Sequence, residues 1–440
     1  MNKIMLIGDS RDCPNYGAIG TTEMLLKEMQ ELNCEIKTIS WRSLNRATPV
    51  DGWKQTASES IANFRYGLYP ETIKGRLQES FANTFLMDEY HLIKKRIKKA
   101  RRRNDGFEIH KYHVPYRYED YADFSQNVIA GLCLQYEKKM LEWADVVVIN
   151  GEGSIVKGTD KNGYYHLGGL YVLFLSYLSK KIFKKETYMI NHTVDPQNRD
   201  IYYMISKVYP LLDGVYVREP LSLKTLKEYC GYDEAVYVPD ALFAFEADES
   251  WHPNNYLDSI IDFSKPYICI GDSSGFYTDS DNLFDVEKMY DELIPKLRKI
   301  CPQVVFIVGF GKYYSPVMKT IRNNNVPFLC IHNSSYVDLF HVLKGAEIFI
   351  SGRWHTSILT LKARTPILLF GSDSHKTEAL YKMINYPYRF FDFRTLRLHT
   401  DEIVSEAQKI IKGDHENSFL LAQQLGQLAK RNIEFLLNRK

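Results

Sequence analysis

The sequence lacks several features that would assign a function at once. Its 440 residues carry 56 Lys+Arg against 54 Asp+Glu, and the formal charge of +2 lacks the basic excess typical of nucleic-acid-binding proteins. The seven cysteines include no Cys-x-x-Cys pair, so neither a zinc site nor a disulfide framework is indicated. A Walker A loop and a complete Gly-x-Gly-x-x-Gly fingerprint are also absent. We therefore expect no nucleic-acid partner, no metal site and no dinucleotide site of the usual kind.

Long hydrophobic runs are absent as well. The first nine residues contain only a four-residue apolar run, which predicts a first strand rather than a signal peptide. The longest apolar stretch, residues 167–178, is interrupted by glycine and serine and is shorter than the roughly 20 residues that a membrane span needs. With its scattered, unpaired cysteines, the chain is expected to be a cytoplasmic protein.

What the chain does have is a repeating pattern of short apolar runs and amphipathic segments. Strand–helix–strand repetition with buried β-branched runs predicts parallel sheets covered on both faces. Residues 246–265, with little periodicity, separate two sets of candidate strands. The sequence thus predicts an α/β fold of two doubly wound Rossmann-like halves facing a cleft: an N-terminal domain over residues 1–250, a C-terminal domain over 260–399, and C-terminal helices over 400–440 that pack back across the hinge.

The stretch 41–125 breaks this rhythm and is rich in aromatic residues. We interpret it as an insertion between the second and third strands of the first half, because functional loops and lids are often such insertions. Within it, residues 94–103 include eight basic residues in ten and predict a basic amphipathic helix. Each Lys or Arg near an anionic bilayer is worth about 1 kcal/mol, so this helix could hold the protein peripherally at the inner face of the membrane. A solvated helix face is the simpler alternative.

The sharpest local pattern lies at residues 348–357. An apolar strand ends in Ser-Gly, and Arg353 and His355 stand at the start of the following helix. Free backbone N–H groups and the helix dipole favour an anion there, Arg353 can bind a carboxylate or phosphate with two hydrogen bonds, and His355 can exchange protons near neutral pH. A capping turn with a surface arginine and a hydrogen-bonded histidine fits the spacing equally well.

Other strand ends resemble this one. Arg218 follows an apolar strand and precedes a helix, although such an arginine is more often a salt-bridge partner. Residues 150–154 form a glycine-rich strand exit that carries Glu152, and residues 268–275 open the second half in a similar way. Ligands of doubly wound sheets bind beyond the carboxyl ends of the strands, which makes these positions candidates for one shared site.

Taken together, these strand ends resemble the polysaccharide pyruvyl transferase family. The resemblance is carried by an ordered set of motifs across most of residues 1–40 and 130–390, with 41–125 outside it: residues 15–19, 150–154, 217–219 with Ser222 and Leu226, 238–243, 351–355, and Lys376 before a helix. Ala18 and Glu152 depart from the family pattern, which usually has an acidic residue and a glycine at these two places. The resemblance implies a GT-B-like fold and transfer of an enolpyruvyl-derived group from phosphoenolpyruvate to a sugar, which forms a cyclic ketal.

The resemblance also implies roles for single residues. Arg218 and Arg353, with His355, Lys376 and the backbone of Trp354, would hold the phosphoenolpyruvate donor. His355 is the candidate proton donor to the methylene carbon, and Glu152 the candidate base for the acceptor hydroxyl. The candidates for binding the acceptor are Asp9, Asn15 and Asn150. No metal or organic cofactor is expected, since phosphoenolpyruvate is itself the donor substrate.

The expected function is therefore pyruvyl transfer onto a glycan or lipid-linked sugar, the precursor of a cell-surface polysaccharide. One alternative is a metal-independent GT-B glycosyltransferase, in which Arg353 and His355 grip the phosphates of a nucleotide sugar and Glu152 is the base. A second alternative is a carbohydrate-binding or assembly protein without catalysis.

Overall fold

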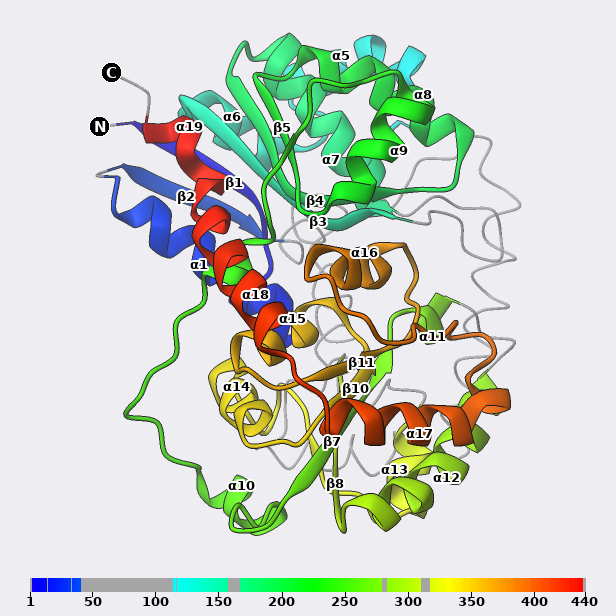
Figure 1. The fold of residues 1–440 in the computed structure, drawn as a ribbon. Helices are drawn as coiled ribbons and strands as arrows, with labels where there is room; N and C mark the ends of the chain where they lie inside the picture. The colour runs from blue at the N-terminus through cyan, green and yellow to red at the C-terminus, as the bar shows by residue number, and fades with distance from the viewer. Residues whose placement is uncertain are drawn as a thin grey trace, which may run out of the picture.

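A computed structural model describes residues 2–40 except 14 and 33, 114–156 except 116, and then 167–278, 283–309 and 317–437. These residues form two lobes, each built on one twisted parallel sheet (Figure 1). The predicted insertion at 41–125 falls outside the described residues up to position 113, and so does the basic stretch 94–103.

The first lobe has six strands in the order β2-β1-β3-β4-β5-β6, and every pairing between them is parallel. Its strands are β1 (Lys3–Asp9), β2 (Glu35–Ser40), β3 (Val146–Val156), β4 (Glu186–Asp195), β5 (Gly214–Val217) and β6 (Val236–Tyr237). Its helices are α1 (Tyr16–Gln30), α5 (Tyr121–Ile129), α6 (Gln135–Trp143), α7 (Leu167–Tyr177), α8 (Arg199–Val208) and α9 (Pro220–Cys230), with short turns η2 (Tyr118–Asp120), η3 (Leu178–Ile182), η4 (Tyr209–Leu211) and η5 (Ala241–Ala244).

The second lobe has five parallel strands in the order β11-β10-β7-β8-β9. Its strands are β7 (Tyr267–Ser273), β8 (Gln303–Ile307), β9 (Phe328–Leu329), β10 (Phe349–Gly352) and β11 (Ile367–Leu369). Its helices are α10 (Asn255–Ile260), α11 (Gly275–Thr278), α12 (Leu283–Ile300), α13 (Met318–Asn323), α14 (Tyr336–Lys344), α15 (Trp354–Lys362), α16 (Lys376–Met383) and α17 (Thr400–Ile411), with the short turn η7 (Leu396–His399). The two sheets and their interleaved helices confirm the predicted α/β fold class.

The central strands are continuous apolar runs because helices cover both faces of each sheet. In β1 the six residues from Ile4 to Asp9 are all buried, and so is every residue of β7. The buried side chains of β1 and β3 alternate between two clusters, one on each face of the first sheet. The cluster that contains Leu6 also contains Trp354 and other residues of the second lobe, so apolar packing continues from lobe to lobe.

The last helices run along both lobes (Figure 1). α18 (Glu416–Ala429) packs on η5 of the first lobe and on α15 of the second, while η8 (Lys430–Ile433) contacts α1. In α19 (Glu434–Leu437), Phe435 stacks on Tyr188 of β4 with ring centroids 3.7 Å apart and on Tyr216 of β5 at 5.5 Å. The C-terminal segment therefore completes the core of the first lobe.

Three segments differ from the pattern in the sequence. The glycine-rich stretch predicted as a strand exit continues β3 to Val156, because Glu152 and Ile155 still pair with β4 opposite His192 and Val194. The helix α8 was not expected, although Asn198 caps its first N–H groups. The last part of the predicted insertion belongs to the first lobe, since Tyr121 of α5 is fully buried and packs edge-on against Phe174.

Within the described residues, none of the helices is long and apolar enough to cross a membrane.

Candidate active site between the lobes

Both sheets have a point where the strand order reverses. In the first sheet this point lies between β1 and β3, where Gly8 and Asp9 end β1 and Asn150 follows the last residue of β3 that pairs with β1; in the second it lies between β7 and β10, at Asp272 and Ser351. Ligands of open parallel sheets bind outside the carboxyl ends of the strands at such points. Most of the candidate residues lie at or beside these two positions.

Asp240 is the centre of the buried polar contacts between the lobes. Its Oδ2 accepts hydrogen bonds from Nη1 of Arg218 at 2.9 Å and from Nε1 of Trp354 at 2.8 Å, and lies 3.3 Å from Nε2 of His355. Its Oδ1 accepts from the backbone N–H of Leu242, which caps η5. Burial tends to raise the pKa of this carboxyl, but His355, Arg218 and Trp354 outweigh burial and hold the pKa well below its ordinary value. Asp240 is therefore a permanent negative charge.

Arg218 lies directly after β5, and only 1% of its surface is exposed. Its backbone N–H continues the sheet ladder to the carbonyl of His192, and its Nε donates to Oγ1 of Thr193 at 3.0 Å. None of the described residues accepts a hydrogen bond from Nη2. A Cβ on Gly153 would lie 3.9 Å from that nitrogen, so glycine keeps the space beside it open. The guanidinium thus has one side fixed by Asp240 and one side that faces the glycine-rich part of β3.

His355 reaches the same carboxylate from the second lobe. Its Nε2 lies 3.1 Å from Nη1 of Arg218, and its ring packs on Gly17 of α1, where an added Cβ would come within 2.0 Å of the histidine Cβ. Burial lowers the pKa of His355; Asp240 raises it in part, and the positive charges of Arg218 and Lys376 lower it further. The imidazole is accordingly neutral at neutral pH in the ligand-free protein.

Two further cations lie at the strand ends of the second lobe. Arg353 forms two hydrogen bonds to Asp272 at the end of β7, with Nε at 2.5 Å and Nη2 at 3.0 Å. Lys376, the first residue of α16, forms an ion pair with Asp373. Burial lowers the pKa of Lys376, Asp373 opposes this shift, and the charges of both Arg218 and Arg353 reach the amine and lower its pKa further. Cations from both lobes therefore act on one small region.

Glu152 belongs to the same group of charges. It lies in β3 with a φ of +42°, a left-handed conformation that is uncommon for a residue other than glycine. Asn150 donates a hydrogen bond to its Oε1 at 3.3 Å. Burial raises the pKa of Glu152 to about 7, Arg218 opposes this rise, and Asp240 adds to it. A carboxyl with this pKa can accept or donate a proton at neutral pH.

The three residues predicted on the acceptor side have local contacts. Asp9 forms a double hydrogen bond with Arg11; burial tends to raise the pKa of Asp9, and the bonds from Arg11 reverse this and lower it. Asn15 is the N-cap of α1, since its side chain accepts from the N–H groups of Gly17 and Ala18. Asn150 donates to the carbonyl of Gly8 and so joins β3 to β1. Only Asn150 contacts a member of the group around Asp240, namely Glu152.

Residues 271–275 also have the Gly-x-Ser-x-Gly spacing of a serine nucleophile turn. In the structure Ser273 is buried at the end of β7, and its hydroxyl donates to the carbonyl of Gly371 at 2.7 Å. None of the described histidines forms a hydrogen bond with Ser273. This motif therefore has a structural role at the junction of β7, β10 and β11, and its serine hydroxyl is not activated as a nucleophile.

The carboxylates that pair with the predicted cations were not predicted from the sequence. Asp240, Asp272 and Asp373 each hold one of the predicted cations, yet no role was assigned to them. The sequence did contain a sign of their importance: like the cations, each of these aspartates lies at the end of a strand or a few residues after it. No group of three or more His, Cys, Asp or Glu side chains within the described ranges is arranged to hold a metal ion.

The chain has a GT-B-like fold of two lobes. Among solved structures, the chain is similar to the UDP-GlcNAc 2-epimerase of Neisseria meningitidis bound to UDP-GlcNAc (TM-score 0.54, 12% identity, all of both chains covered) and to that of Methanocaldococcus jannaschii in complex with UDP-GlcNAc and UDP (0.52, 10%, all of both chains). The spinosyn rhamnosyltransferase SpnG is similar as well (0.51, 9%, all of both chains). At such identities the likeness concerns the fold alone.

The chain belongs to the polysaccharide pyruvyl transferase family, a family of transferases, whose sequence profile it matches over residues 67–374. The match begins inside the stretch 41–125, which we had expected to lie outside the resemblance, and it does not extend to residues 1–40. No curated protein matches the sequence.

Proposed function

We propose that this protein transfers the enolpyruvyl-derived group of phosphoenolpyruvate to a sugar of a cell-surface polysaccharide precursor and closes a pyruvate ketal. One observation supports this most: Arg218 of the first lobe and His355 of the second lie 3.1 Å apart on the buried Asp240, while the charges of Arg218 and Arg353 both act on Lys376. Phosphoenolpyruvate is small and carries three negative charges, so it needs several cations within a short reach.

The free donors in this region suit such an anion. Nη2 of Arg218 faces the space beside Gly153, and α15 begins two residues after β10 ends, with no side chain of the described residues capping its first N–H groups. Arg353 and Lys376 are each neutralised by an aspartate in the ligand-free protein. In our proposal the donor shares these cations with Asp272 and Asp373, which hold the cations in place before it arrives.

The proposed chemistry uses two proton carriers. His355 gives a proton to the methylene carbon of the donor, and the resulting cation at C2 is attacked by a sugar hydroxyl whose proton passes to Glu152. The bond from C2 to the phosphate oxygen then breaks, and a neighbouring hydroxyl attacks C2 and closes the ring. Over one turnover Glu152 releases the proton of the first hydroxyl and His355 regains the proton that it gave to the new methyl group, while the proton of the second hydroxyl leaves on the released phosphate, so atoms and charges balance.

The pKa directions agree with these roles. Glu152, with a pKa of about 7, is a carboxyl that can take up a proton near neutral pH. His355 is neutral in the free protein because burial and the charge of Arg218 lower its pKa. An anionic phosphate beside the ring raises the pKa of the imidazole, so in our proposal His355 becomes an acid only when the donor is bound.

Binding of phosphoenolpyruvate tests the proposal directly. Because a ligand of the native state stabilises it by RT ln(1 + [L]/Kd), a concentration of about 100 times Kd should stabilise the protein by about 2.7 kcal/mol in a thermal-shift experiment. Arg353→Gln should remove this effect, whereas Arg364→Gln, which changes an exposed arginine paired with Glu416, should keep it. Stabilisation by UDP or UDP-sugars but not by phosphoenolpyruvate would favour the glycosyltransferase alternative and contradict our proposal.

Turnover gives the second test. His355→Gln should retain binding of phosphoenolpyruvate within a few-fold but slow the acceptor-dependent release of phosphate by about 10²–10⁴-fold, the range for loss of a general acid. Isothermal calorimetry and a phosphate-release assay separate the two effects. Release at the wild-type rate would show that His355 is not the proton donor.

A further inference from the structure

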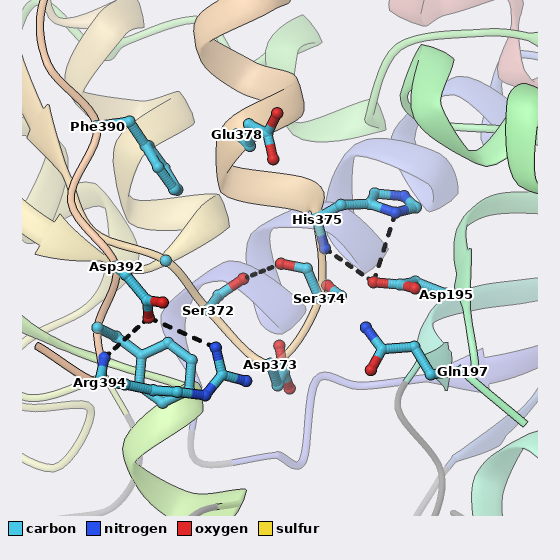
Figure 2. A pocket seen from close by; sticks show the side chains of 12 residues that line it. Asp195, Gln197, Ser372, Asp373, Ser374, His375, Glu378, Phe390, Asp392 and Arg394 are labelled. Atoms are coloured by element: carbon cyan, nitrogen blue, oxygen red, sulfur yellow. Dashed lines mark hydrogen bonds and ion pairs between the residues drawn. The ribbon is translucent and has the colours of Figure 1, made fainter.

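A second site lies beside the group around Asp240. It is a cavity of about 530 Å³ between the lobes, within the roughly 300–1,000 Å³ of small-molecule sites (Figure 2). The first lobe contributes Asp195, the last residue of β4, and Gln197, whose φ is +49°. The second lobe contributes the loop between β11 and α16 and the segment 390–394. The cavity therefore lies at the carboxyl ends of strands from both sheets.

The charged groups that line this cavity are paired. Oδ2 of Asp195 accepts from the backbone N–H of His375 at 2.9 Å and lies 3.4 Å from its Nδ1. Asp392 accepts two hydrogen bonds from Arg394, one from the backbone N–H and one from the side chain. Asp373 is paired with Lys376. A fourth lining carboxylate, Glu378, is paired with Lys382, and His375 is shared between Asp195 and Glu219. The lining therefore has more carboxylates than cations, so it offers many hydrogen-bonding groups but no net attraction for an anion.

One wall of the cavity is aromatic. Phe390 is partly exposed and touches the edge of Tyr381, with ring centroids 5.8 Å apart. Figure 2 shows Phe390, Asp392 and Arg394 on the side of the cavity opposite Asp195 and Gln197. A hexose ring has apolar C–H faces and a rim of hydroxyls, and it needs an apolar surface on one side and paired donors and acceptors around it. Phe390 and the neutralised charge pairs supply both.

The cavity also adjoins the cations assigned to the donor. Asp373 lines it, while the partner of Asp373, Lys376, is the amine on which Arg218 and Arg353 act. A ligand in the cavity is thus separated from the donor region by a single ion pair. Most of the second-lobe wall, including segment 390–394, lies beyond residue 374, where the match to the family profile ends.

We infer that this cavity binds the acceptor as a neutral, polyhydroxylated sugar ring, with Phe390 against one face of the ring and Gln197 and the paired carboxylates on its hydroxyls. The inference rests on the proposed function, because it supplies the second substrate of that reaction. The inference also predicts a specificity. Sugars that carry a carboxylate or phosphate should bind in the cavity more weakly than neutral sugars, because none of the described lining residues offers them an unpaired positive charge.

Saturation-transfer NMR on the full chain, with methyl galactoside and methyl glucoside as probes, tests the inference without any turnover. The wild-type protein should bind at least one neutral glycoside at millimolar concentration, and methyl glucuronide less well. Phe390→Ala should weaken binding by at least about tenfold. Phe263→Ala is the matched control, because it removes a partly exposed phenylalanine of the same lobe that does not line the cavity.

Gln197→Ala provides a second variant in case Phe390→Ala fails to fold, because Gln197 is exposed and its loss leaves the packing intact. It too should weaken glycoside binding while leaving the affinity for phosphoenolpyruvate unchanged. No binding of either glycoside by the wild type, wild-type affinity in both variants, or displacement of the glycoside by phosphoenolpyruvate would each overturn the inference. Glycoside binding that requires Phe390 and Gln197 would support it even if phosphoenolpyruvate failed to bind, a result that contradicts the proposed function alone.

Discussion

Replacement of Glu152 by glutamine should stabilise the protein and impair the reaction, and the two effects have one cause. Burial raises the pKa of this carboxyl from 4.5 to about 7. Between these two pH values the unfolded chain has released the proton while the folded protein still holds it, so the free energy of unfolding falls as the pH rises. At about 1.36 kcal/mol per pKa unit, the loss reaches at most about 3 kcal/mol above pH 7.

Glutamine keeps the hydrogen bond that Oε1 accepts from Asn150 but carries no charge. Glu152→Gln should therefore equal the wild type in stability near pH 4 and exceed it by up to about 3 kcal/mol at pH 8. Urea unfolding measured at a series of pH values gives this difference directly. The same variant should lose the step near pH 7 in the pH profile of phosphate release, because a base with that pKa is gone.

Glu142→Gln is the control, since Glu142 is an exposed carboxylate at the end of α6 and should show no such pH-dependent gain. A stability difference between Glu152→Gln and the wild type that stays flat from pH 4 to 8, or that grows toward acid, would refute the reasoning. It would mean that Glu152 ionises as an ordinary surface carboxyl.

Two further predictions concern the contact between the lobes. Asp240→Asn leaves Arg218 buried without its counter-charge and should lower the free energy of unfolding by about 3–5 kcal/mol, measured with urea. Asp213→Asn, which changes a partly exposed ion pair of the same lobe, should lower it far less. A similar loss in both variants would contradict the role given to Asp240. Gly17→Ala places a Cβ 2.0 Å from that of His355 and should lower both the melting temperature and the affinity for phosphoenolpyruvate, although alanine is the better helix former. Gly20→Ala in the same helix meets the end of the Leu242 side chain at 2.8 Å and the edge of the Tyr336 ring at 3.3 Å, contacts that smaller shifts relieve, so it should cost less. Equal melting temperatures for the two variants would show that the lobes do not touch at Gly17.

Much of the fold could be predicted from the sequence because parallel strands between helices are nearly continuous apolar runs. The apolar run at residues 214–217, for example, predicts a strand, and β5 forms with these bounds. The ends of β3 and β4 could not be predicted, since the polar residues there are buried by pairing between two strands far apart in the sequence. The helix α8 was overlooked. Its N-cap, Asn198, comes three residues after the end of β4, and β4 itself extends further than its apolar run.

The candidate site was predictable in part for a similar reason. Arg218, Arg353 and His355 follow apolar strands, and this local pattern is visible in one sequence. Their partners are not, because the contact of Asp240 with Trp354 and His355 joins residues more than a hundred positions apart in different lobes. The local contacts of Asn15 and Asp9, with the first N–H groups of α1 and with Arg11, are likewise seen only in the folded structure, and their roles in acceptor binding stay predictions.

The stacking of Phe435 on Tyr188 and Tyr216 has a consequence for biosynthesis. The strands that carry the two tyrosines emerge from the ribosome long before the helix that covers them. Domains generally fold as units in the order of their synthesis. Here the N-terminal lobe has an unfinished apolar surface until Phe435 has been translated, so its maturation is coupled to that of the lobe made after it.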